Sequence, residues 1–94
     1  MTLQSQSDVA YQPSFQARVM QAMVTAAVAI QAESTGTSNH TNRANYAKLV
    51  LNAPQQYVFA FAQGVASQGQ DNNATDATIQ NTVNSIWNAL AGTV

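Results

Sequence analysis

The chain has 94 residues, no cysteine and a net charge of −1, which predicts one small domain held by packing, without disulfide bonds or a thiolate metal site. Its three basic residues cannot neutralise a row of phosphates, so the sequence argues against nucleic acid as the main partner. They also supply no basic face for binding to a membrane surface.

Residues 1–13 are expected to form a polar N-terminal arm in front of a helical domain over residues 14–94. The first residues are mostly polar and lack helical periodicity, and ordering a residue costs roughly 1–2 kcal/mol. Only Val9, Ala10 and Tyr11 form an apolar run. These three are therefore the candidate interface, reached by a mobile arm or a short docking strand that contacts a neighbouring chain.

The first helix is predicted over residues 14–33. Pro13 and Ser14 stand at its start, and the Ser14 hydroxyl is the expected N-cap. Apolar residues recur at helical spacing on a face that is wide enough to contact two or more other helices.

This segment also imitates a signal peptide, because residues 19–30 form an apolar run behind Arg18. The polar lead-in, the single basic residue and the interrupting Gln21 and Thr25 favour a core helix over secretion.

Two further helices are predicted over residues 41–52 and 54–68, with Tyr46 at the margin of the core. Pro54 separates them, since proline has no amide to donate and suits the first turn of the next helix. Gly64 is expected where another backbone comes close, because glycine inside a helix costs about 1 kcal/mol.

An exposed loop over residues 69–75 leads to the last helix, predicted over residues 76–91. Thr75 or Asp76 is its expected cap, and Gly92 its expected end. The sequence therefore predicts an all-α fold, a compact four-helix domain with a polar N-terminal arm. Large apolar side chains at helical spacing are the expected core anchors: Phe15, Val19, Met23, Ile30, Val50, Leu51, Phe61, Val83, Ile86, Trp87 and Leu90.

No catalytic, cofactor or metal site is apparent in the residue pattern. His40 is the single histidine, and its neighbours in sequence have the character of loop or capping residues, so we expect it to be dispensable for any activity. Asp71, Asn73 and Thr75 match the first ligands of a calcium loop, but Asp76 stands where that loop needs glycine, and Thr82 where it needs glutamate. We expect no enzyme, no cofactor and no small-molecule substrate.

The surface composition favours a protein that is covered by other proteins. Gln, Asn, Ser and Thr make up more than a third of the chain, while Lys, Arg, Asp and Glu number seven. Burying an amide or a hydroxyl costs less desolvation than burying a charge. An ordinary soluble protein with an amide-rich surface stays open as the alternative.

Three segments resemble small proteins encoded among the virion genes of tailed bacteriophages: FQARVM at 15–20, HTNRA at 40–44 leading to VLNAP at 50–54, and TVNSIWNALAG at 82–92. The resemblance covers nearly the whole chain from Phe15 onward and rests on packing motifs. It implies a non-enzymatic structural component at the neck, the tail or the capsid surface. Such a component is made in the host cytoplasm, is located in the virion, and assembles in multiple copies with other virion proteins or with itself. The alternative is a cellular helical adaptor or small regulatory subunit that binds one soluble partner.

Overall fold

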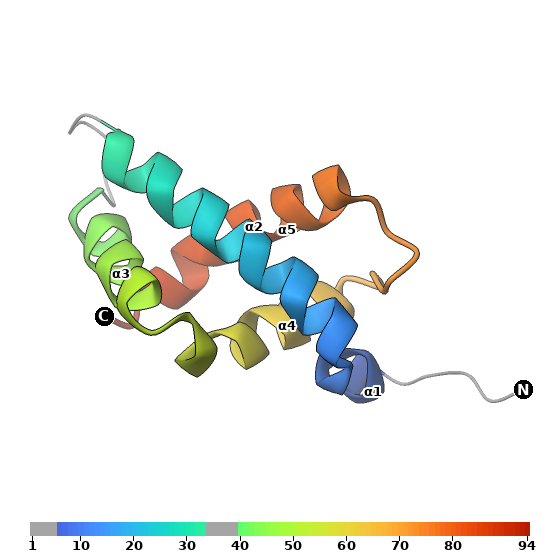
Figure 1. Cartoon of the computed structure of the whole chain (residues 1–94). Coiled ribbons are helices and arrows are strands. Elements are labelled where there is room, and N and C mark those ends of the chain that lie inside the picture. Colours follow the sequence, from blue (N-terminus) through green and yellow to red (C-terminus); the bar gives the residue numbers. More distant parts are fainter. Residues whose placement is uncertain (1–5, 34–39) are drawn as a thin grey trace, which may run out of the picture.

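The computed structural model describes residues 6–33 and 40–94, and all regular secondary structure in these ranges is helical (Figure 1). The all-α prediction is confirmed. The elements in chain order are α1 (Gln6–Tyr11), α2 (Pro13–Ala32), α3 (His40–Asn52), a 3₁₀ turn η1 (Pro54–Gln56), α4 (Val58–Ser67) and α5 (Asp76–Ala91).

Helix α2 organises the fold, because it packs against all the other elements (Figure 1). It runs for 20 residues without an internal glycine or proline, and alanine, the strongest helix former, recurs along it. Its first residue is Pro13, whose fixed φ suits a first turn. The expected cap at Ser14 is wrong: the N-cap position belongs to Gln12, which makes no capping hydrogen bond through its side chain, and Ser14 lies inside the helix.

The core lies between α2 and the other helices. Eight of the expected anchors have 4% of their surface or less exposed: Phe15, Val19, Met23, Ile30, Val50, Phe61, Val83 and Trp87. Leu51, Ile86 and Leu90 instead are half-buried and pack against the edge of the core. The reason is angular: successive residues lie about 100° apart around a helix, so a residue next to the inward stripe turns aside. In α5 that stripe is Ile79, Val83, Trp87 and Ala91.

Four aromatic rings from α3, α4 and α5, with the residue before α4, form the centre of the core. Trp87 meets Tyr46 edge-on at 5.2 Å between ring centroids and lies tilted at 5.4 Å from Phe61. Tyr46 also meets Tyr57 edge-on at 5.5 Å. Tyr46 is therefore not marginal as predicted: 5% of its surface is exposed. Burial, and then the neighbouring Tyr57, raise the pKa of the Tyr46 hydroxyl above its usual value.

The expected N-terminal arm is corrected over the part that the structure describes. Residues 6–11 form α1, which packs against α4, and Val9 and Ala10 are 6% and 0% exposed. The Gln16 side chain closes the end of this helix by donating from Nε2 to the Ala10 carbonyl at 2.7 Å. Val9 and Ala10 thus belong to the core of their own domain, where their burial on α4 offsets the cost of ordering a short helix. The part of the arm over residues 1–5 lies outside the described residues.

The third predicted helix is divided into η1 and α4 by Tyr57. Gly64 lies opposite a side chain instead of a backbone, because a Cβ at this position would come within 2.7 Å of the Ile86 Cδ1 atom. Gly69 follows the end of α4 with φ of +82°, a conformation that favours glycine. Helix α5 has the predicted bounds, and Thr75 caps it by accepting from the Thr78 amide at 3.1 Å.

Candidate functional site

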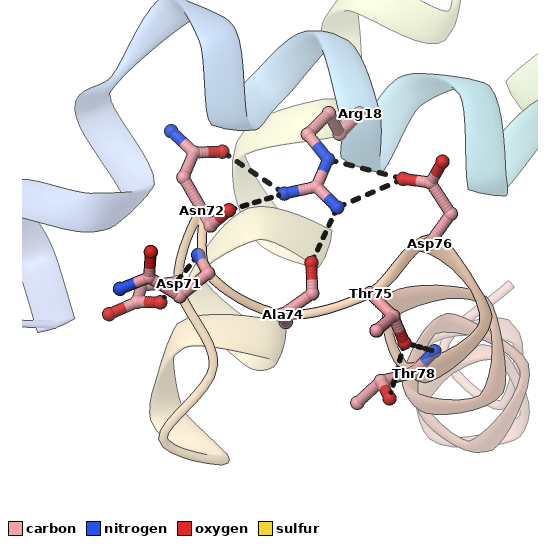
Figure 2. Close-up of polar contacts among 8 residues, drawn as sticks. Arg18, Asp71, Asn72, Ala74, Thr75, Asp76 and Thr78 are labelled. Carbon is pink, nitrogen blue, oxygen red and sulfur yellow. Dashed lines mark hydrogen bonds and ion pairs between the residues drawn. The ribbon is translucent and has the colours of Figure 1, made fainter.

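The most extensive polar cluster in the described chain surrounds Arg18, on the face of α2 that lies beside the loop before α5 (Figure 2). Its Nε and Nη2 atoms donate to the Asp76 carboxylate at 3.2 and 2.9 Å. Nη1 donates to the Asn72 carbonyl at 3.0 Å, and Nη2 to the Ala74 carbonyl at 2.6 Å. The planar guanidinium suits this task because its donors point in fixed directions. We call Arg18, Asn72, Ala74 and Asp76 the Arg18 clamp.

The loop that the clamp holds is also closed by its own residues. The Asp71 carboxylate accepts from the Asn73 amide at 2.8 Å, which is an Asx turn, as Figure 2 shows. The Asn72 side chain donates to the Ser14 hydroxyl at 2.9 Å, a second link to α2. These contacts use the oxygens that a calcium loop would need, and no group of three potential metal-ligating side chains occurs within residues 6–33 and 40–94.

Chemically, the Arg18 clamp positions a loop and has no reactive group. Arginine stays protonated at all ordinary pH values and cannot act as a base. The Asp76 side chain is 89% exposed, and it stands in the first turn of α5, where a negative charge is favoured by the helix dipole. The cluster therefore fixes the start of α5 against α2.

A second polar cluster joins the end of α2 to the start of α3. Arg43 donates from Nη1 and Nη2 to the two oxygens of Glu33, at 2.9 and 3.3 Å. The His40 Nδ1 atom lies 3.9 Å from the same carboxylate, too far for a hydrogen bond. His40 is the first residue of α3, and its side chain is 17% exposed, so it is more enclosed than the sequence suggested. No described Ser, Thr or Lys forms a hydrogen bond with it, so a nucleophile and base pair is not assembled here.

Of the three residues expected at an interface, Tyr11 alone is accessible. Its surface is 67% exposed, and its ring lies 4.8 Å from that of Phe59 at an angle of 40°. Phe59 is half-buried on α4, so the pair forms an aromatic step on the outside of the α1 and α4 contact. We call Tyr11 and Phe59 the aromatic step. The other large apolar residues with high exposure lie on other elements: Val28, Leu49 and Val94.

Sequence reasoning missed the Arg18 clamp completely. Arg18 and Asp76 are 58 positions apart, and neither stands in a motif that predicts pairing. The only available signal was that Asp76 opens a helix, where an acidic residue favours the first turn.

The chain was compared with protein-family models, with curated proteins and with solved structures. None of the three comparisons found a match. Among the described helices, none is both long enough and apolar enough to cross a bilayer.

Proposed function

We propose that the chain is a non-enzymatic structural protein of a tailed-phage virion, associated with its neck, tail or capsid. In this proposal it assembles in multiple copies through contacts with other virion proteins, with copies of itself, or with both. The virion placement comes from the sequence resemblance. The structural role is supported by the surface of the folded chain.

The observation that carries the proposal is the near absence of unneutralised charge. Two of the three basic side chains are in ion pairs, Arg18 with Asp76 and Arg43 with Glu33. The remaining exposed surface is largely amide and hydroxyl, because the helices place their Gln, Asn, Ser and Thr residues outward. Covering such a surface with protein costs little desolvation, whereas nucleic acid or an acidic surface would find almost no cation to bind.

The aromatic step offers an anchor for such contacts. Interface hot spots are enriched in Tyr and Trp, whose rings supply large contact area at low entropic cost. Tyr11 is held in place from below by Phe59 and by the buried Val9 and Ala10 on the same helix.

The test is the size of the assembly and its presence in particles. Native mass spectrometry and light scattering of the purified chain across a concentration series should show a closed ring or a larger assembly. Mass spectrometry of purified particles from the host should find the chain in multiple copies. A defined one-to-one complex with a soluble cellular protein would favour the adaptor alternative. A chain that stays monomeric at all concentrations, and is absent from particles, would overturn the proposal.

The contribution of the aromatic step is tested by Tyr11→Ser. This variant should weaken assembly at least about tenfold, the effect of losing a modest hot spot. Val28→Ser is the matched control, since Val28 is another exposed apolar residue, at 55%, but lies on α2. Equal effects of the two substitutions would show that the aromatic step has no special role.

A further inference from the structure

A hollow of about 150 Å³ lies between α2, α3 and α5, away from the Arg18 clamp and the aromatic step. Ala26, Ala29 and Ile30 of α2 form its apolar side. Its polar side is made by the Glu33 and Arg43 ion pair, and Trp87 of α5 also lines it.

Two N–H donors on the walls of this hollow are buried and have no partner. They are the indole Nε1 of Trp87, a residue with 1% of its surface exposed, and the Nε of Arg43. Nearly all buried donors in folded proteins are paired, since burial takes away their hydrogen bonds with water. Both groups are donors only, so what is missing beside them is a hydrogen-bond acceptor.

The charges around the hollow favour a neutral acceptor. Glu33 already engages the Nη1 and Nη2 atoms of Arg43, so the positive charge of that arginine is compensated. A second carboxylate would stand beside that of Glu33 and be repelled by it. A carboxamide fits both sides, because its carbonyl accepts from the unpaired donors and its NH₂ group donates toward a carboxylate on the wall.

The size of the hollow limits the occupant to a small group. A protein cavity of similar volume, about 150 Å³, takes a molecule of the size of benzene. The alanine and isoleucine wall suits a short aliphatic stem. We propose that this hollow binds a neutral carboxamide on a short aliphatic stem, the group that a free aliphatic amide or the glutamine side chain of another protein presents.

Trp87 is the only tryptophan, so its indole N–H gives a single resonance in a proton–nitrogen correlation spectrum. Butyramide should move this resonance saturably, with a Kd on the order of 10 mM, as expected for a ligand of so few atoms. Butyrate, which has the same shape and a negative charge, should bind at least about tenfold more weakly because of Glu33. N-acetylglutamine methylamide forms the second arm. Tighter binding of this compound than of butyramide would identify a protein side chain as the source, and the reverse order a free amide.

Two alanine substitutions complete the test. Ala29→Leu fills the hollow from its apolar side and should abolish the butyramide shift, while the indole resonance itself persists. Ala17→Leu places the same side chain at an exposed position of α2 outside the hollow and should leave the shift unchanged.

The proposal is overturned if the indole resonance does not respond, if butyrate acts as strongly as butyramide, or if Ala29→Leu binds as well as the parent. Any of these results would leave a hollow that holds water only. The inference stands independently of the proposed function, because the assembly test uses Tyr11 on another surface.

Discussion

Arg18 shows how much a single side chain contributes when its partners are backbone atoms. The carbonyls of Asn72 and Ala74 lie in a loop without regular structure, where no helix or strand supplies a donor for them. The guanidinium satisfies both and reaches a carboxylate as well. Lysine carries the same charge but has one nitrogen, so it cannot make this set of contacts.

Arg18→Lys should therefore lower the free energy of unfolding by about 1–2 kcal/mol, measured by urea denaturation. The loss is moderate because the Arg18 side chain is 27% exposed and that of Asp76 is 89% exposed. Lys48→Gln is the control, since this exposed charge should change stability by less than about 0.5 kcal/mol. Equal stability of Arg18→Lys and the parent would mean that the loop holds itself in place.

Trp87→Ala should remove most of the stability of the domain. Truncating a buried aromatic residue typically costs about 3–5 kcal/mol, and small domains have roughly 5–15 kcal/mol in total. Trp87→Phe keeps a ring between Tyr46 and Phe61 and should be milder. Circular dichroism during thermal unfolding gives both values. A melting temperature unchanged by Trp87→Ala would place this residue outside the core.

The helices differ in how clearly the sequence announces them. Long elements with caps were predicted closely, since Pro54, Thr75 and the apolar periodicity of α2 and α5 each have one simple reading. Helix α1 was missed because six residues are too few to display a period. The inward stripe of α5 was predicted one position too broadly at Ile86 and Leu90, because only the packing partners decide which flank of a stripe is covered.

The attachment of α1 is tested by Ala10→Leu. Ala10 is completely buried, so the larger side chain should overpack the contact with α4 and cost about 1–3 kcal/mol in chemical denaturation. The same substitution at the exposed Ala17 serves as the control and should be close to neutral. A neutral Ala10→Leu would restore the view of this segment as an unattached arm.

The contact between α4 and α5 is tested at Gly64. Alanine is favoured over glycine in a helix by about 1 kcal/mol, but here its Cβ would meet the Ile86 Cδ1 atom at 2.7 Å. Ile86→Val removes that atom. Gly64→Ala should therefore stabilise the Ile86→Val background by about 0.5–1 kcal/mol, and gain less in the parent. The same gain in both backgrounds would show that Ile86 moves aside without cost.

On the scale of the whole molecule, the surface can be described by what it lacks. With few charges, and most cations already paired, long-range electrostatic forces have little to act on. The composition predicted this property directly. The pairing itself was not predictable, because it depends on which helix ends meet in the fold.

Any assembly formed by the chain should consequently persist when the salt concentration rises. At about 1 M ionic strength the screening length falls to about 3 Å, which would weaken contacts between exposed charges but not those between amides and aromatic rings. Light scattering across a salt series measures this directly. Dissociation into monomers on adding salt would indicate that the few charges carry the interface.

The central place of α2 has a consequence for synthesis on the ribosome. This helix is made early, yet its partner α5 ends at Ala91, roughly sixty residues later. At about 5–20 residues per second, the apolar face of α2 waits roughly 3–12 s before its last partner emerges. During that interval the nascent chain presents the surface that chaperones recognise, and a neighbouring polysome offers identical faces. We expect the yield of correctly folded chain to depend on translation speed between α3 and α5 more than on any single contact in the finished molecule.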